Sequence, residues 1–302
     1  MTLRLLNNDI YCKFAQLRTI SVNNNSDTPK LIDIEKVISS KNPKLLKWMP
    51  KFILNYIRRT IHEDEINYVV HTYGKDYDGL DFVNAVITQH WHASYDVTGL
   101  DDIPQNGRYI FASNHPLGAF DGLMLMNAIG NRFLEIKFIV NDLLLLIPPL
   151  QPLFVPVNKY GRQSADYAKR IEETYASLTK QVLYFPSGLC SRKIHGEITD
   201  LPWKRNFLQK AVQYQRDVVP VYFDGHNSRF FYNIASFRKK LGIKANIEMF
   251  YLPDEFFKQK NAHYAINFGK PISWETFDKS RSLDEWTQFV RSKVYAMSGK
   301  KD

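Results

Sequence analysis

From residue 93 onwards, short apolar runs alternate with amphipathic segments. The runs are rich in β-branched and aromatic residues, which is typical of buried strands; they lie at 108–112, 136–140, 153–157, 181–185, 218–223, 246–251 and 264–268. Segment 162–178 repeats apolar residues at every third or fourth position, and 283–297 does the same, so both are predicted to be amphipathic helices. This alternation predicts an α/β fold with a mixed central sheet flanked by helices.

The first part of the chain is predicted to be a helical extension, residues 1–92, in front of an α/β domain of residues 93–302. Its start is polar and is expected to be flexible. Segment 44–61 has apolar residues and a tryptophan at helical spacing, with Lys and Arg between them, and Pro50 is expected to break it. A basic amphipathic helix suits a membrane interface, and the alternative is a helix packed on the domain with its lysines in water.

Composition limits the classes of partner. The 302 residues are 44% hydrophobic, enough for a sizeable core, and carry a net charge of +9. That charge favours an anionic membrane surface, an acidic carrier protein or nucleic acid. Two cysteines give no disulfide framework and fit a reducing cytoplasm. Because no apolar run approaches the roughly 18 residues of a spanning helix, we expect only peripheral membrane contact, through 44–61 or 233–244.

The candidate chemistry is concentrated between a predicted strand and an apolar helix, in the stretch SNHPLGAFDG at 113–122. Pro116 disfavours helical backbone at His115, and Gly118 accepts a left-handed conformation. The chain is therefore expected to bend and to bring Asp121 back to His115. A carboxylate on one imidazole nitrogen fixes the tautomer and frees the other nitrogen to take a proton. The alternative is a core histidine beside a helix-capping aspartate.

Two further motifs follow predicted strands. In VPVNKYGR at 155–162, Lys159 and Arg162 lie near a helix start and could bind an anion there, or could be surface charge. In YFPSGLCSRK at 184–193, Gly188 would let the backbone approach a ligand, and Arg192 would contact an anionic group. Downstream, Asp200 is expected to open the next helix.

Together these motifs resemble the glycerolipid acyltransferase superfamily, over roughly residues 93 to 272. The usual first motif has four residues between the histidine and the aspartate, whereas this chain has five between His115 and Asp121. Ser187 stands where the glycerolipid enzymes carry glutamate. Both features resemble the hemolysin-like branch, which includes the ornithine and glycine N-acyltransferases of bacterial aminolipid synthesis.

The resemblance implies an acyltransferase of membrane lipid synthesis. It would move an acyl chain from a thioester, expected on acyl carrier protein, to the amino group of a small polar acceptor such as glycine or ornithine. His115 is expected to be the general base and Asp121 to orient it. The residues expected to bind substrate are Asn114, Gly122, Lys159, Arg162, Phe185, Pro186, Ser187, Gly188 and Arg192. We expect no metal, redox cofactor or nucleic acid, and a cytoplasmic protein on the inner face of the membrane.

Three alternatives remain open. The first is an O-acyltransferase for glycerol 3-phosphate or lysophosphatidate, against which Ser187 counts. The second is a hydrolase built on the His115/Asp121 pair, although the chain has no G-x-S-x-G nucleophile motif. The third is a basic membrane-binding protein without catalysis.

Overall fold

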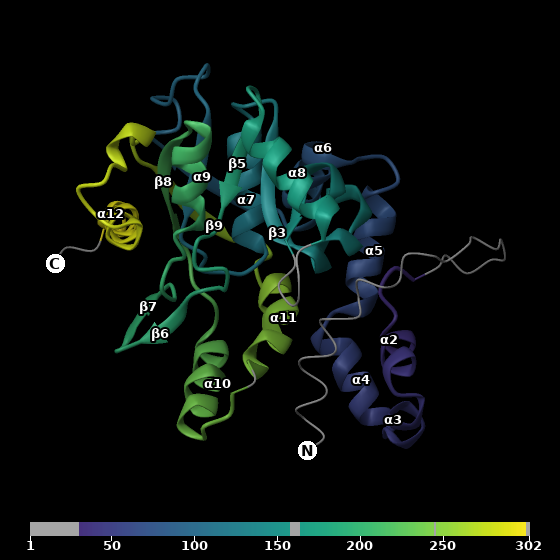
Figure 1. The fold of residues 1–302 in the computed structure, drawn as a ribbon. Coiled ribbons are helices and arrows are strands. Elements are labelled where there is room, and N and C mark those ends of the chain that lie inside the picture. The colour runs from purple at the N-terminus through teal and green to yellow at the C-terminus, as the bar shows by residue number, and fades with distance from the viewer. Residues whose placement is uncertain (1–29, 158–163, 245, 300–302) are drawn as a thin grey trace.

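The centre of the protein is a mixed β-sheet (Figure 1). The computed structural model describes residues 30–157, 164–244 and 246–299, and in these residues seven strands follow the order β1-β9-β8-β2-β5-β3-β4. All neighbours pair in parallel except β8 and β9. The strands are β1 (Ser94–Thr98), β2 (Tyr109–Ser113), β3 (Ile136–Asn141), β4 (Phe154–Val157), β5 (Gln181–Tyr184), β8 (Asp217–Asp224) and β9 (His263–Phe268), and a separate hairpin is formed by β6 (Arg192–Ile194) and β7 (Glu197–Thr199).

Helices cover both faces of the sheet. Those before β1 are α2 (Ile34–Lys41), α3 (Pro43–Trp48), α4 (Lys51–Thr60), α5 (Glu63–Tyr73), α6 (Gly79–Ala85) and the π-helical η2 (Val86–His90). Those after it are α7 (Phe120–Gly130), α8 (Ala165–Ala176), α9 (Asn206–Tyr214), α10 (Arg229–Lys240), α11 (Leu252–Phe257) and α12 (Leu283–Ala296), with 3-10 turns η3 (Asp142–Leu146), η4 (Pro148–Leu153), η5 (Ile247–Tyr251) and η6 (Trp274–Thr276).

Strand β2 contributes side chains to the hydrophobic cores on both faces of the sheet. All of its residues are buried, and successive side chains point to opposite faces. Tyr109 and Phe111 join the core formed with α6 and α7, whereas Ile110 and Ala112 join the core formed with α9 and α12. A parallel strand buried on both sides reads as a continuous apolar run, which is why the sequence revealed it.

The N-terminal helices have two kinds of packing. Helices α2 and α4 share a small cluster of their own, built on Ile34, Ile38 and Leu54. Residues 82–91 instead join the core of the sheet. A domain boundary at residue 92 stays a prediction. Helices α3, α4 and α10 all lie at the lower end of the molecule in Figure 1, with α10 apart from the other two. No helix among the described residues is long and apolar enough to cross a bilayer.

Most of the predicted elements are confirmed, and the break at Pro50 separates α3 from α4. The strand predicted at 246–251 is wrong, because this segment forms the 3-10 turn η5, which places Glu248 inside the protein. Strand β1 was missed because it lies at the sheet edge and alternates polar residues with few apolar ones. The predicted flexible start, residues 1–30, lies outside the described residues except for its last position.

Candidate active site

The chain bends sharply where β2 ends, and α7 begins only at Phe120. Gly118 has a φ of +97°, a conformation that L side chains rarely adopt. A Cβ atom at this position would also lie 3.2 Å from a methyl carbon of Leu252. The bend therefore depends on a glycine at residue 118, and it is the bend that the sequence predicts.

The bend brings Asp121 to His115. Nδ1 of His115 lies 3.0 Å from Oδ2 of Asp121, whose side chain is fully buried. The same Oδ2 accepts the Leu117 N–H at 2.9 Å, and Oδ1 accepts the Gly122 N–H at 2.8 Å. An ionised carboxylate only accepts hydrogen bonds, so it selects the imidazole tautomer that carries its proton on Nδ1. The lone pair of Nε2 is then available, and no described residue hydrogen-bonds to this atom.

His115 is held by its ring and by its backbone. The ring stacks on Phe185 with centroids 4.0 Å apart and an interplanar angle of 18°. The His115 N–H donates to Oδ1 of Asp200 at 3.2 Å, and its carbonyl accepts the Ser191 N–H at 2.7 Å. Only 13% of the His115 side chain is exposed. The imidazole is therefore fixed in place, with one edge open.

Asp200 is a site residue that sequence reasoning misassigned. It does not open a helix, because α9 begins at Asn206. Its buried carboxylate accepts Ser191 Oγ–H at 2.6 Å and the Trp203 indole N–H at 2.8 Å, in addition to the His115 N–H. Burial raises the pKa of the Asp200 carboxyl above its usual range, although these hydrogen bonds oppose the rise. Nothing local in the sequence distinguishes it from a helix cap.

Asn114 connects the bend to the neighbouring strand. Its amide Nδ2 donates to the carbonyl of Phe223 at 2.9 Å, and its Oδ1 accepts the Phe223 N–H at 2.7 Å. Both ends of the buried amide are used in this pairing between the end of β2 and β8. The structure thus gives Asn114 a positioning role where sequence reasoning expected a substrate contact.

The segment after β5 completes the site. Ser187 is buried, and its hydroxyl donates to the carbonyl of Leu189 at 2.8 Å, which shapes the turn. The Pro186 carbonyl accepts the Lys204 N–H at 3.0 Å. Gly188 and His115 line the same cavity. The structure brings this predicted motif to the histidine.

Gly122 contributes close packing. A Cβ atom at this position would lie 2.8 Å from the ring of Phe138 and 3.7 Å from that of Phe185. The first of these distances is shorter than real Cβ contacts allow, so a side chain would push one ring away. The ring that would move is that of Phe138, which packs edge-on against Phe185 with centroids 5.2 Å apart. Because Phe185 stacks on His115, the glycine indirectly keeps the imidazole in position.

Arg192 lies in the core and lines neither cavity described below. Its Nε and Nη2 contact the Glu248 carboxylate at 3.2 and 3.1 Å, and Nη1 donates to the Cys190 carbonyl at 2.6 Å. Arg238 of α10 binds the other side of Glu248. A buried carboxylate without these partners costs several kcal/mol. The guanidinium that sequence reasoning assigned to an anionic substrate is thus engaged with Glu248. Lys159 and Arg162 lie outside the described residues.

Beside His115 lies a cavity of about 410 Å³. His115, Asn141 and Asn246 contribute polar side chains to its lining, Gly118, Ala119 and Gly188 also line it, and the rest of its wall is mainly apolar. That wall includes Val69, Phe82, Val86, Trp91, Leu123, Leu150, Leu252, Phe256 and Phe257. Buried in this wall, Cys190 has a thiol whose pKa is raised by burial, which disfavours a nucleophilic thiolate. An apolar chain with its reacting group at the histidine fits this arrangement.

Comparison with known proteins identifies the family. A family model described as acyltransferase matches residues 36–302. This chain belongs to the acyltransferase family. The match extends the resemblance found in the sequence motifs to the N-terminal helices, and the protein is a member of the glycerolipid acyltransferase superfamily that acts in lipid synthesis.

Two curated relatives cover nearly the whole chain. The lyso-glycine lipid O-acyltransferase of Bacteroides thetaiotaomicron is 44% identical over 272 residues, which are 90% of this chain and 99% of that protein. The enzyme of the same name from Phocaeicola vulgatus is 43% identical, over 90% of this chain and 96% of its own. Among solved structures, the 1-acyl-sn-glycerophosphate acyltransferase PlsC of Thermotoga maritima matches at 16% identity and a TM-score of 0.46, covering 83% of this chain and 90% of that one.

Proposed function

We propose that this acyltransferase esterifies the hydroxyl of a single-chain amino-acid lipid, a lyso-glycine lipid. The observation that carries acyl transfer is the mainly apolar cavity lined by His115, which fits the acyl chain that is transferred. Such a wall stabilises a hydrocarbon chain by about 0.8 kcal/mol for each buried methylene. The names of two relatives more than 40% identical, aligned over nearly their whole length, support this acceptor.

Transfer to the amino group of glycine or ornithine is the second candidate. It rests on the five residues between His115 and Asp121 and on Ser187, both of which resemble the N-acylating branch. The relatives' names favour a hydroxyl acceptor over an amine. In both cases the proposed donor is an acyl thioester on acyl carrier protein. The net charge of +9 supports an acidic donor of this kind.

The proposed mechanism uses the His115/Asp121 pair. Nε2 of His115 takes the proton of the acceptor hydroxyl as the oxygen attacks the thioester carbonyl. Asp121 stabilises the resulting imidazolium through Nδ1. The tetrahedral intermediate collapses, the C–S bond breaks, and the thiolate takes the proton back from His115. At the start of α7, N–H groups without partners in the helix are suitable donors to the oxyanion, since Gly118 and Ala119 line the cavity.

His115→Ala is expected to lower kcat by at least about 10²-fold, since the general base is lost.

Asp121→Asn should lower kcat steeply with little change in KM, because an amide no longer selects the Nδ1–H tautomer. His263→Ala is the control, since His263 is half exposed at the first position of β9 and lines neither cavity. Steady-state kinetics measure kcat and KM of the three variants, and circular dichroism checks that each variant is folded. Near-normal kcat in His115→Ala, or a change in KM alone in Asp121→Asn, contradicts these roles.

The acceptor is tested by supplying acyl carrier protein loaded with an acyl chain, and acyl-CoA in a parallel series. Lyso-glycine lipid, glycine, ornithine, lysophosphatidate and glycerol 3-phosphate are offered separately, and products are identified by mass spectrometry. We expect an ester of lyso-glycine lipid, formed faster from the carrier protein. An amide of free glycine or ornithine as the only product would establish the second candidate instead. Product from the phosphate-bearing acceptors alone would contradict both.

We also propose that the protein binds the inner face of the membrane through α3, α4 and α10. Their exposed apolar side chains include Trp48 at 86%, Phe52 at 73% and Phe237 at 62% exposure. Exposed lysines accompany them, namely Lys44, Lys47, Lys51, Lys239 and Lys240. These helices lie at one end of the molecule (Figure 1). Apolar side chains rimmed by basic ones suit the interface of an anionic bilayer.

Sedimentation with vesicles tests this surface. Binding should require anionic lipid and weaken as salt rises, because part of it is electrostatic. Phe52→Ala is expected to weaken binding about tenfold, from the lost burial of one aromatic side chain. Leu134→Ala is the control, since Leu134 is 94% exposed but lies outside these helices. Equal binding to neutral vesicles, or an equal loss in the control, would argue against this surface.

A further inference from the structure

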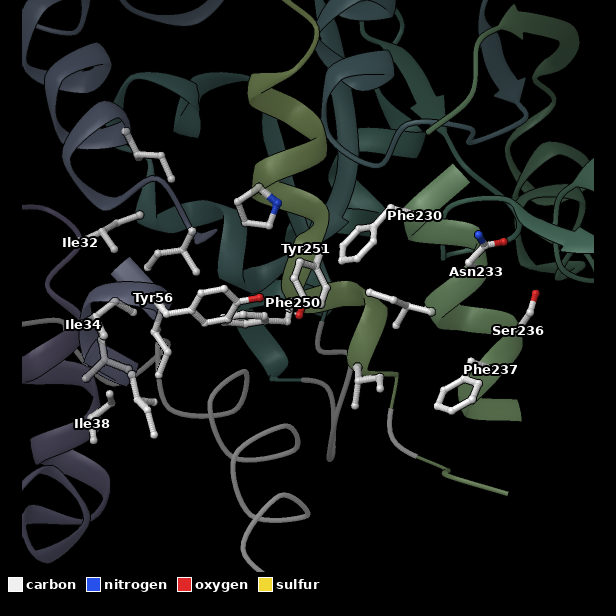
Figure 2. Close-up of a pocket in the computed structure, with 18 of the residues that line it drawn as sticks. Ile32, Ile34, Ile38, Tyr56, Phe230, Asn233, Ser236, Phe237, Phe250 and Tyr251 are labelled. Carbon is white, nitrogen blue, oxygen red and sulfur yellow. Dashed lines mark hydrogen bonds between the residues drawn. The ribbon is translucent and has the colours of Figure 1, made fainter. Parts of the chain in front are cut away.

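A second, larger cavity lies beside the catalytic one. Its volume is about 1070 Å³, and it runs between the N-terminal helices α2 and α4 on one side and α10 and η5 on the other. Figure 2 shows Ile34, Ile38 and Tyr56 facing Phe230 across Tyr251. Most of its wall is aliphatic or aromatic, and its polar side chains include Asn233, Ser236 and Lys240. We refer to it as the α4–α10 groove.

Three residues connect this groove to the catalytic cavity. Ile32, Ile66 and Pro253 line both of them. The backbone at Ile32 is held in place, because its N–H donates to Oδ1 of Asn67 at 2.9 Å and its carbonyl accepts the Asn67 amide at 2.7 Å. The two cavities therefore meet along an apolar border whose backbone is held at Ile32. A molecule seated in the groove lies next to one seated at His115.

The groove also opens toward the proposed membrane surface. Phe230, Tyr56 and Phe237 line it and are each at least half exposed. The hydroxyls of Tyr56 and Tyr251 hydrogen-bond at 2.9 Å and connect α4 with η5. A lipid at the ends of α4 and α10 can thus enter from the bilayer without its chain crossing water.

We propose that the α4–α10 groove binds the acyl chain of the acceptor lipid, while the cavity at His115 binds the acyl chain of the donor. The inference rests on the proposed function, because that reaction joins two molecules that each carry a chain. The donor carbonyl oxygen must reach the N–H groups at the start of α7, where Gly118 and Ala119 line the cavity at His115, and this assigns the donor chain to that cavity. The acceptor then needs a second apolar site next to the first. A small amino acid as acceptor would need no such site.

The test compares two tryptophan substitutions on one helix. Ile53 lines the groove and is 37% exposed, so Ile53→Trp adds bulk to the wall without burying a new group. Asn55 is exposed on the same helix and lines neither cavity, so Asn55→Trp is the matched control. Both are assayed in detergent micelles, so that vesicle binding does not contribute. The acceptors are lyso-glycine lipids with successively shorter chains, and the donors are acyl carrier proteins with a similar series.

For the wild-type protein, we expect KM for the acceptor to rise about tenfold for each loss of about two methylenes. Ile53→Trp should raise KM for the longest acceptor about tenfold or more and flatten this dependence, because the added ring occupies the space of several methylenes. Its kcat/KM for the shortest acceptor and its preference among donor chains should stay at wild-type values. Asn55→Trp should match the wild type throughout.

Several results would overturn the assignment. A shift of the donor preference by Ile53→Trp would mean that the groove holds the donor chain. A lower melting temperature with unchanged acceptor KM would mean that the groove is filled by the chain's own residues 1–29. Equal effects of the two tryptophans would mean that the groove has no specific role. A wild-type protein that esterifies none of these acceptors overturns the proposed function itself, and the assignment with it.

Discussion

The site depends on one hydrogen bond, between Nδ1 of His115 and the buried carboxylate of Asp121. An isolated carboxylate taken out of water costs several kcal/mol, so it remains charged only where donors surround it. Here two backbone N–H groups, of Leu117 and Gly122, join the imidazole in that role. These donors converge only because the chain bends at Gly118. The burial of the Asp121 carboxylate and the tautomer of His115 therefore both depend on the bend at Gly118.

Residues at or after the ends of several strands keep the bend and the imidazole of His115 in place. Asn114 fastens the end of β2 to Phe223 of β8, and Asp200 holds the His115 backbone. The turn after β5 supplies Phe185 beneath the ring. Ligand sites in open α/β sheets lie at such carboxyl ends of strands. At the start of β6, shortly after this turn, Arg192 contacts Glu248 in η5, which also binds Arg238 in α10. The segment beside the histidine and a wall of the α4–α10 groove thus share one buried ionic cluster.

The sequence predicts the parts of this fold that local physics determines. Strand β2 reads as an apolar run because both its faces are buried, and Pro116 with Gly118 indicates the bend before any contact is known. Contacts between residues that are far apart in the chain cannot be predicted from such local patterns. Asp200 resembles a helix cap until the fold places it on the His115 backbone, and Arg192 resembles a ligand for anions until Glu248 is found beside it. The strand predicted at 246–251 failed for the same reason, since the burial of Glu248 between two arginines outweighs its apolar neighbours. The groove is formed by residues from 32–66 and 230–253, which are far apart in the chain, so no local pattern marks it.

The claim on which the account rests is that Asp121 holds His115 with its proton on Nδ1 and its lone pair on Nε2. Nuclear magnetic resonance of protein carrying nitrogen-labelled histidine measures this directly, because protonated and unprotonated ring nitrogens have well separated chemical shifts. Comparison with the His115→Ala spectrum assigns the signals. We predict that the neutral ring of His115 carries its proton on Nδ1, and that Asp121→Asn abolishes this preference. A neutral His115 with its proton on Nε2 would contradict the account.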